Sequence, residues 1–339
     1  MGGDRVTSLE VARRAGVSQS AVSRVFTPGA SASQKTAQKV RKAAAELGYR
    51  PNVLARAMVS GKSRMIGLVV AYLNNQFYPE ALEKLSNALQ ERGYHVLMFM
   101  ASQTAGNIDE VVGEILDYQV DGIIAASVAL SSSLSQRCAD AGVPIVLFNR
   151  SEDGGAISSV TSDNLAGGRK VAEFLLAGGH QKIGHIAGWE GASTQRDREA
   201  GFTAALAEAG QPLHAREVGD FRIDTAREAT RRMFASDPPD AVFVANDHMA
   251  FAVLDTLRSE LGLSVPGDVS VVGYDDVPAA SWPAYDLTTV RQPANRMVAE
   301  TVDLLLEKIE NTAAAPRRIA IDGPLIVRGS ARKPEGWTP

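Results

Sequence analysis

The chain has 339 residues, of which 45% are hydrophobic and 22% charged, a composition ordinary for a soluble protein of two or three domains. Its charge is unevenly distributed: residues 1–64 carry twelve Lys or Arg and three acids, a net +9, whereas the remainder has 23 basic and 36 acidic residues, a net −13. A short segment with such a positive surplus indicates contact with nucleic acid, which the sequence pI of 5.8 conceals.

Several other classes are excluded by residue usage. Cys138 is the only cysteine, which rules out an internal disulfide and a thiolate zinc cage. The five histidines show no HExxH or similar ligand spacing, and no run of eighteen apolar residues occurs. We therefore expect no metal, no cofactor and no redox chemistry, in a cytoplasmic protein that is neither secreted nor membrane-bound.

The basic segment begins with two short helices. Residues 7–10, TSLE, have the form of a capping box and predict a helix that ends at Gly16. Ser18 can cap a second helix, Gln19–Phe26. A helix, a glycine-containing turn and a second helix form a DNA-reading unit, whose outward side chains suit base edges and phosphates. The apolar positions of the first helix include Leu9, Val11, Ala12 and Ala15. In the second helix Val22 and Val25 should face inward, and the expected readout residues are Gln19, Ser20 and Arg24.

A third helix, Gln34–Leu47, is predicted by a cap at Ser33, an apolar face and Gly48 in the C′ position. The sequences TSLEVARRAGVSQSAVSR at 7–24 and LGYRPNVLARAM at 47–58 resemble the lactose and galactose repressor (LacI/GalR) family in order and spacing. The resemblance implies an all-α helix-turn-helix headpiece over residues 1–48 and a hinge over 49–63. The implied DNA-binding residues are Thr7, Ser18, Gln19, Ser20, Ser23, Arg24, Tyr49, Asn52, Ala55 and Met58.

In that family the hinge forms a short helix, here residues 52–59, when the dimer binds its operator. Met58 stands where the family usually has Leu, a side chain wedged into the central base step through the minor groove. Met is an acceptable wedge, although its chain is more flexible. Two plainer interpretations remain open: Met58 packs on its symmetry mate without touching DNA, or the headpiece is a small bundle whose polar face is merely solvated.

After residue 64, β-rich runs alternate with amphipathic stretches, the βαβ pattern of parallel sheets. The rhythm repeats after Asp163, which predicts two α/β lobes. By resemblance, the body is like the periplasmic sugar-binding proteins, and the last helix, 296–310, returns to the first lobe. The predicted subdomains are 64–162 with 292–324, and 163–291 with 325–339. The predicted strands are 65–71, 95–100, 122–126, 182–187, 241–245 and 269–273, and the predicted helices are 80–92, 108–118, 167–177, 198–208, 225–235, 249–260 and 296–310.

Parallel sheets bind ligands beyond the carboxyl ends of their strands, where several polar and aromatic residues fall. Arg198, Asn246 and Asp275 match family positions that hydrogen-bond effector hydroxyls, and Phe221 matches an aromatic wall, so that the chemistry suits a polyol. Alternatively, Arg198 and Asp275 form an interlobe salt bridge without a ligand. For Asp247 we expect no ligand contact, because the Asn-Asp pair at 246 and 247 should cap a helix. The candidate effector-binding residues are Phe77, Tyr78, Ser127, Arg150, Arg198, Phe221, Asn246 and Asp275.

Enzymatic chemistry finds no support in the sequence. His180 and His185 lie around a predicted turn and strand, where a structural role is favoured over a metal site. No Walker or Rossmann glycine pattern occurs, and the adjacent pair Asp275 and Asp276 should point apart. No nucleophile accompanies a base.

These features predict a transcriptional repressor that binds a near-palindromic operator as a homodimer and is released by a small-molecule effector, most plausibly a sugar. Residues 329–339 contain no apolar heptad, which favours a dimer over a tetramer. One alternative is a corepressor-dependent regulator, like the purine-sensing relatives. Another is a cytosolic ligand-binding or carbohydrate-processing protein whose N-terminal module serves protein contacts only; salt-dependent DNA binding would separate it from a regulator.

Overall fold

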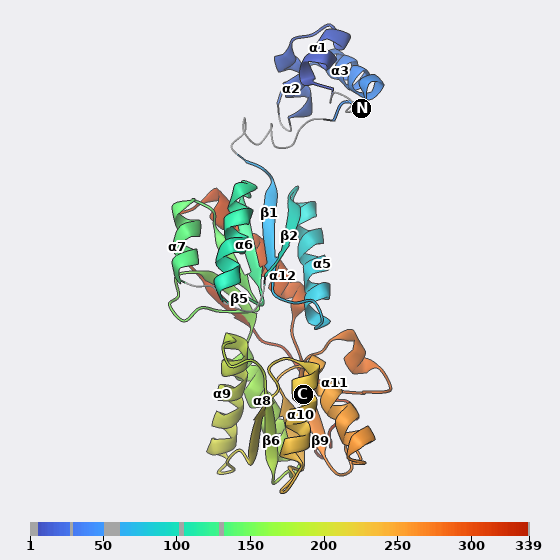
Figure 1. The fold of residues 1–339 in the computed structure, drawn as a ribbon, viewed down its shortest axis with the longest axis vertical. Helices are drawn as coiled ribbons and strands as arrows, with labels where there is room; N and C mark the ends of the chain where they lie inside the picture. The colour runs from blue at the N-terminus through green and yellow to red at the C-terminus, as the bar shows by residue number, and fades with distance from the viewer. Residues whose placement is uncertain (1–5, 28–29, 51–61, 102–104, 129–131, 338–339) are drawn as a thin grey trace. The chain divides into compact units, whose positions relative to one another are not determined.

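The computed structural model describes residues 6–27, 30–50, 62–101, 105–128 and 132–337 and divides into two compact units, residues 1–64 and 65–339. Figure 1 shows both units, which we describe separately. Over these described ranges, no helix is long and apolar enough to cross a membrane.

The first unit, the headpiece, contains α1 (Ser8–Ala15), α2 (Gln19–Phe26) and α3 (Gln34–Leu47), as the sequence predicted. Its N-caps are Thr7, Ser18 and Ser33. The capping box of α1 is present, and Gly48 ends α3 in the left-handed conformation. The buried core consists of Val11, Ala12, Val22, Val40, Ala43 and Ala44. Leu9, although apolar, is 44% exposed, because Val11 and Ala12 occupy the buried stripe of this short helix.

The first lobe of the body is built on a parallel six-stranded sheet of order β11-β5-β4-β3-β1-β2. Helices α5 and α12 cover one face and α6 and α7 the other. The strands are β1 (Met65–Val70), β2 (His95–Met100), β3 (Gly122–Ala126), β4 (Ile145–Phe148), β5 (Ser158–Ser162) and β11 (Arg318–Ile321); the helices are α5 (Phe77–Glu91), α6 (Ala105–Asp117), α7 (Ser132–Asp140) and α12 (Ala294–Glu310).

The second lobe repeats this plan in a sheet of order β12-β10-β9-β8-β6-β7, parallel except for β12, which runs antiparallel to β10. Helices α8 and α9 cover one face and α10 and α11 the other. The strands are β6 (Ile183–Ala187), β7 (Ala215–Val218), β8 (Ala241–Val244), β9 (Ser270–Asp275), β10 (Thr288–Arg291) and β12 (Leu325–Ile326); the helices are α8 (Asn164–Ala177), α9 (Ser193–Glu208), α10 (Ile223–Met233), α11 (Asp247–Asp255), the π-helical η1 (Thr256–Glu260) and the 3₁₀ turn η2 (Pro278–Ser281).

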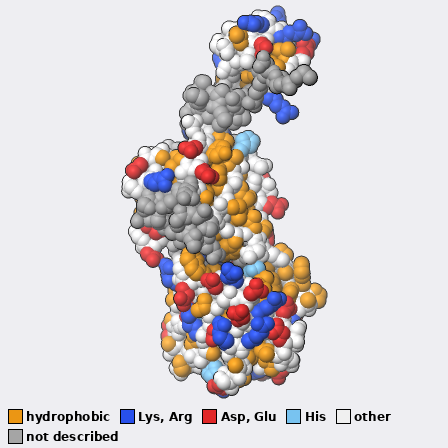
Figure 2. Space-filling view, viewed as in Figure 1, with side chains coloured by type: hydrophobic (Ala, Val, Ile, Leu, Met, Phe, Trp, Pro, Cys, Tyr) orange, Lys and Arg blue, Asp and Glu red, His pale blue; other side chains and the backbone are white. Residues whose placement is uncertain are grey.

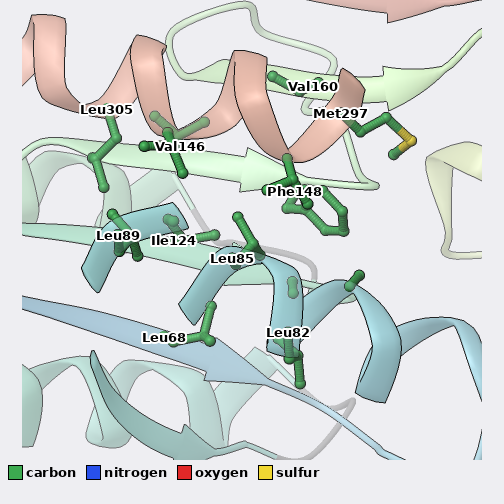
Figure 3. Packing of buried hydrophobic residues seen from close by; sticks show 14 of the residues in the cluster. Leu68, Leu82, Leu85, Leu89, Ile124, Val146, Phe148, Val160, Met297 and Leu305 are labelled. Carbon is green, nitrogen blue, oxygen red and sulfur yellow. The ribbon is translucent and has the colours of Figure 1, made fainter. Parts of the chain in front are cut away.

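The last long helix packs on the first lobe, which confirms the expectation drawn from the family resemblance. Figure 3 shows Met297 and Leu305 of α12 beside Val146 and Phe148 of β4. The chain therefore passes between the lobes after β5, after β10 and after β11.

All seven helices predicted for the body begin two to five residues earlier than the sequence suggested, and two of these shifts concern the site. Helix α5 starts at Phe77 instead of residue 80, and α9 starts at Ser193 instead of residue 198. The first turns of α9 are buried although their side chains are polar, so no apolar periodicity marks them. Arg198 consequently lies inside a helix, one turn after Thr194.

Glycines let α8 and α9 approach closely. A Cβ at Gly168 would lie 2.0 Å from the carbonyl oxygen of Arg198, and a Cβ at Gly201 would lie 2.0 Å from that of Leu165. No side chain fits at either position without a backbone shift. This contact fixes the position of α9 relative to α8, and thereby the position of Arg198 in the second lobe.

Candidate functional site

The proposed DNA-reading face of the headpiece is exposed and held by local hydrogen bonds. Gln19 Nε2 donates to Ser8 Oγ at 2.9 Å, Ser18 Oγ accepts from the backbone N–H of Ala21, and Arg24 Nε donates to the Ser20 carbonyl. Thr7 and Ser18 thus serve as caps, while the outer positions of α2 remain available to a partner. Ser23 is also exposed there.

The remaining proposed DNA contacts are Tyr49, Asn52, Ala55 and Met58. Tyr49 is half-buried and packs its ring against Phe26, with ring centroids 5.9 Å apart, so it supports the headpiece core. Asn52, Ala55 and Met58 lie outside the described residues, and their assignment stays a prediction.

In the body, Arg198 is the most densely bonded of the proposed site residues. Its Nε donates to Asn164 Oδ1 at 2.8 Å and its Nη1 to the Ala245 carbonyl at 2.6 Å. Its guanidinium lies 3.7 Å from the centre of the Tyr274 ring, and its Nη2 lies 3.5 Å from Asp275 Oδ1. Planar stacking and a fork of fixed donors are the properties that favour Arg at a buried site.

Asp275 ties this arrangement to the other lobe. Its Oδ2 accepts from Asn75 Nδ2 of the first lobe at 3.2 Å, and its Oδ1 accepts from Gln292 Nε2 at 2.7 Å. Burial raises the pKa of Asp275, while Arg198, Asn75 and Gln292 stabilise its carboxylate. One buried carboxylate therefore gathers groups from both lobes and from the crossing segment after β10.

Asn246 and Asp247, which follow β8, have different roles. Asn246 Oδ1 accepts from the backbone N–H of Met249 and caps α11. Asp247 is fully buried instead: its Oδ1 accepts from Thr289 Oγ1 at 2.6 Å and its Oδ2 from the backbone N–H of Val277 at 3.0 Å. The expectation that the Asn-Asp pair caps a helix is therefore confirmed, with Asn246 as the cap, whereas the Asp247 carboxylate bonds to Thr289 of β10 and to Val277 after β9. Burial, reinforced by Asp275, raises its pKa to about 7.

Arg150 is the second buried cation of this region. Its Nη1 donates to the Asn149 carbonyl and to Thr194 Oγ1, both at 2.8 Å, and so links the two lobes. Its guanidinium lies 6.0 Å from the Phe221 ring. Within the described part of the chain, Arg150 forms no ion pair with a carboxylate, and its pKa is raised despite burial, through the phenolic groups of Tyr72 and Tyr78.

The remaining first-lobe candidates have mainly packing roles. Tyr78 Oη accepts from Asn149 Nδ2 at 3.2 Å. Phe77 is buried and stacks on Phe148, with centroids 6.2 Å apart. Ser127 Oγ accepts from the backbone N–H of Ala71 at 3.3 Å. Of these residues, Phe77 also borders an interlobe cavity.

That cavity has a volume of about 310 Å³ and is bordered by both lobes and the crossing segment. Its lining includes Phe77, Asp275, Arg291, Gln292 and Arg296. A second cavity of about 250 Å³ is lined by Asn75, His248, Phe251, Val277 and Tyr285, among others. Asp275 and Asn75, which bond to each other, border one cavity each.

Three buried polar atoms of this region have no hydrogen-bond partner among the described residues. They are Asn149 Oδ1, Arg150 Nε and Gln292 Oε1. The arginine N–H is a donor and the two amide oxygens are acceptors. The region can therefore satisfy a ligand that offers donors and acceptors together. No group of three or more His, Cys, Asp or Glu in the described ranges is arranged to hold a metal ion.

Sequence reasoning missed several members of the network. Asn75, Asn164, Thr194 and Gln292 were not singled out, although each contacts a residue that was. For Thr194 and Asn164 the signal was absent, since polar residues at a helix start usually suggest capping. Gln292 could have been found, because it follows a strand at the crossing between lobes.

Comparisons with known proteins agree with this architecture. The family model described as bacterial regulatory proteins, lacI family, matches residues 8–52, and the periplasmic binding protein-like domain matches residues 172–331. The HTH-type transcriptional regulator CelR of Thermobifida fusca is 35% identical over 339 residues, covering 96% of this chain and 98% of its own length. The ribose operon repressor of Escherichia coli (strain K12) is 31% identical, covering 96% and 99%.

Solved structures give the same result. The lac repressor dimer bound to operator and the anti-inducer ONPF superposes with a TM-score of 0.87 at 29% identity, covering 96% of this chain and 99% of that one. The CelR–cellobiose complex has a TM-score of 0.73 at 33% identity, covering 96% and 100%.

Fold, headpiece and interlobe site together define a DNA-binding transcriptional regulator with a ligand-responsive body. The extent and identity of the sequence match make the assignment specific: this chain belongs to the LacI family of bacterial transcriptional regulators.

Proposed function

We propose that this regulator is a dimeric repressor whose operator complex is released by a neutral saccharide bound between the lobes of the body. It acts on DNA in the cytoplasm and is not an enzyme. The observation that carries the choice of ligand is the mixture of unpartnered donors and acceptors beside the Arg198–Asp275 pair.

A hydroxyl group both donates and accepts hydrogen bonds, so adjacent sugar hydroxyls can satisfy Arg150 Nε and the amide oxygens of Asn149 and Gln292 at once. A fully ionised phosphate only accepts and would leave both amide oxygens unpaired, at a cost of about 1–3 kcal/mol each. The rings of Phe221 and Tyr274 next to the two arginines suit the C–H face of a sugar. The relative CelR has been solved with cellobiose, which supports the same class.

Dimerisation is supported by apolar surface at one edge of the first lobe. Strand β2 is an edge strand of the first sheet, and its Met98 and Met100 are each 51% exposed. Leu73, two residues before Asn75, is exposed as well. Figure 2 shows hydrophobic side chains gathered on this part of the lobe. Exposed apolar side chains on an edge strand favour a protein interface.

Coupling between effector and operator follows from the network. A ligand that bonds to Arg150, Arg198 and Asp275 contacts groups of both lobes and so favours one relative lobe position. Linkage requires that an effector which weakens operator binding is itself bound more weakly by the operator complex. Equal effector affinity for free and operator-bound protein would contradict this mechanism.

The function is tested first by a thermal-shift screen of the purified protein against cellobiose, ribose, other saccharides, sugar phosphates and nucleobases. Stabilisation by a neutral saccharide, lost in Arg198→Ala and Asp275→Ala, supports the proposal. A response confined to nucleobases would favour the corepressor mechanism of the purine-sensing alternative. A response to none of them, with the fold intact, would refute the proposed sensing role.

DNA binding is tested separately. The basic headpiece predicts an operator affinity that falls steeply with salt, linearly in log–log coordinates. Substitution of exposed Arg24 by Ala should weaken the complex, whereas Arg231→Ala on the second lobe should leave it unchanged. An absence of DNA binding at low salt would favour the alternative in which the module serves only protein contacts.

A further inference from the structure

The first two turns of α9 present two different faces. Thr194 and Arg198, four residues apart, contact the first lobe's Arg150 and the Asp275 carboxylate. Gln195 and Glu199, also four residues apart, contact each other at 2.9 Å and lie next to His185. Residues at this spacing share one side of a helix. The contacts of Gln195 and Glu199 therefore determine the position of Thr194 and Arg198 on the same helix.

Gln195 is buried and bonded on both ends of its amide. Its Oε1 accepts from the backbone N–H of Gly188 at 2.7 Å, and its Nε2 donates to Glu199 Oε2 and lies 3.2 Å from His185 Nε2. Glu199 is held in turn by Arg216 of β7, at 2.6 Å. A single side chain thus connects α9, the end of β6 and the following loop.

The contacts of His185 fix its tautomer. Its Nδ1 lies 3.0 Å from the Phe243 carbonyl oxygen, which only accepts, so we assign the ring proton to Nδ1. Its Nε2 is then the acceptor of one Gln195 N–H. Burial lowers the pKa of His185 to about 4, and the charged groups facing it are Glu199 and Arg216, beside the apolar Phe243. The imidazole is accordingly neutral at physiological pH.

Gly188 connects this anchor to the aromatic wall of the site. A Cβ at Gly188 would lie 2.2 Å from the Phe221 ring, so the ring packs directly on the backbone that Gln195 holds. We propose that Gln195, with neutral His185 as its hydrogen-bond acceptor, is a positioning residue for effector recognition. It holds the start of α9, from which Thr194 and Arg198 reach the site, and it holds the Gly188 backbone on which the Phe221 ring packs. This inference rests on the proposed effector site.

The test compares two nearly isosteric variants. Gln195→Met fills the same space without hydrogen bonds, and we expect its dissociation constant for cellobiose to rise about tenfold at every pH from 5.5 to 8, the equivalent of about one buried hydrogen bond. Gln195→Glu can still accept from Gly188, but its other oxygen faces two acceptors, His185 Nε2 and Glu199 Oε2, where wild-type Gln195 has an amide donor. Protonation within this cluster relieves part of the repulsion, so we expect the dissociation constant to be about tenfold above wild type at pH 8 and closer to wild type at pH 5.5.

A matched control separates positioning from stability. Met233→Ala removes buried volume in α10 of the same lobe without deleting a hydrogen bond of the site, and should lower the melting temperature while the dissociation constant changes less than twofold. An unchanged dissociation constant in Gln195→Met, or an equal loss at all pH values in Gln195→Glu, would overturn the proposal.

A ligand-free readout keeps this test separate from the proposed function. The side-chain resonance of Arg198 Nε–H, bonded to Asn164, should shift in Gln195→Met and stay unchanged in Met233→Ala. If no saccharide binds the wild type but this shift is seen, the sugar assignment fails and the positioning role stands. If the resonance does not move, the positioning role fails.

Discussion

Replacing Arg198 by Ala removes the cation at the centre of the interlobe network. The change deletes hydrogen bonds to Asn164 Oδ1 at 2.8 Å and to the Ala245 carbonyl at 2.6 Å, together with the stacking on Tyr274. It also leaves the Asp275 carboxylate, which is 4% exposed, without its cation. The cost is therefore that of an unpaired buried charge.

Removing one partner of a buried pair typically costs about 3–5 kcal/mol of unfolding free energy, and we expect a loss of that size at pH 8. In the variant, the pKa of Asp275 rises further above its unfolded value, because burial is then opposed only by the amide donors of Asn75 and Gln292 and by the charge of Arg150. Such a group destabilises the folded state increasingly as pH rises through its folded pKa. The loss should accordingly be smaller at pH 5.5, by at most about 1.4 kcal/mol for each unit by which that pKa has risen.

Urea unfolding followed by tryptophan fluorescence measures this loss of unfolding free energy in the second lobe, because all three tryptophans, Trp189, Trp282 and Trp337, belong to that lobe. A double-mutant cycle with Asp275→Asn should give a coupling of several kcal/mol.

The control cycle uses Arg231 and Glu260, an exposed pair of the same lobe with a 2.8 Å contact, whose coupling should stay below about 1 kcal/mol. A coupling at Arg198 and Asp275 no larger than in this control, with no dependence on pH, would refute the reasoning.

Three further changes test other parts of the structure. Gly168→Ala places a Cβ 2.0 Å from the carbonyl oxygen of Arg198 and should lower the free energy of unfolding in urea by about 1–3 kcal/mol. The control Ala204→Ser, on the exposed side of α9, should change it by no more than about 0.5 kcal/mol, and equal effects would contradict the close helix contact. Burial raises the pKa of Asp247 to about 7, above the ordinary value of 3.8 for an aspartate, so the folded protein should lose stability as pH rises between these values. Asp247→Asn should remove this slope between pH 5 and 8, and a slope that persists would assign it to another group. Thr7→Ala deletes the cap of α1 and should speed hydrogen exchange of its amides about fivefold, the equivalent of about 1 kcal/mol; exchange at the wild-type rate would show that the cap is dispensable.

Local signals in the sequence determined the headpiece almost completely. The capping box of Thr7 and Glu10, the cap at Ser18 and the glycine after α3 each join residues only a few positions apart, so their geometry follows from the local sequence. The alternation of strands and helices likewise fixed the α/β class of the body, because burial of parallel strands leaves apolar runs that need no knowledge of their neighbours.

Tertiary structure alone decided which polar groups meet. Asn75 and Asp275 are 200 residues apart, and the contact of Arg150 with Thr194 joins two lobes. The role of Asp247 depended on Val277 and Thr289, which come from other segments. A polar side chain near a strand end can cap, bridge or bind, and the sequence does not separate these roles, because the free energy of each depends on partners that only the folded chain brings within hydrogen-bond distance.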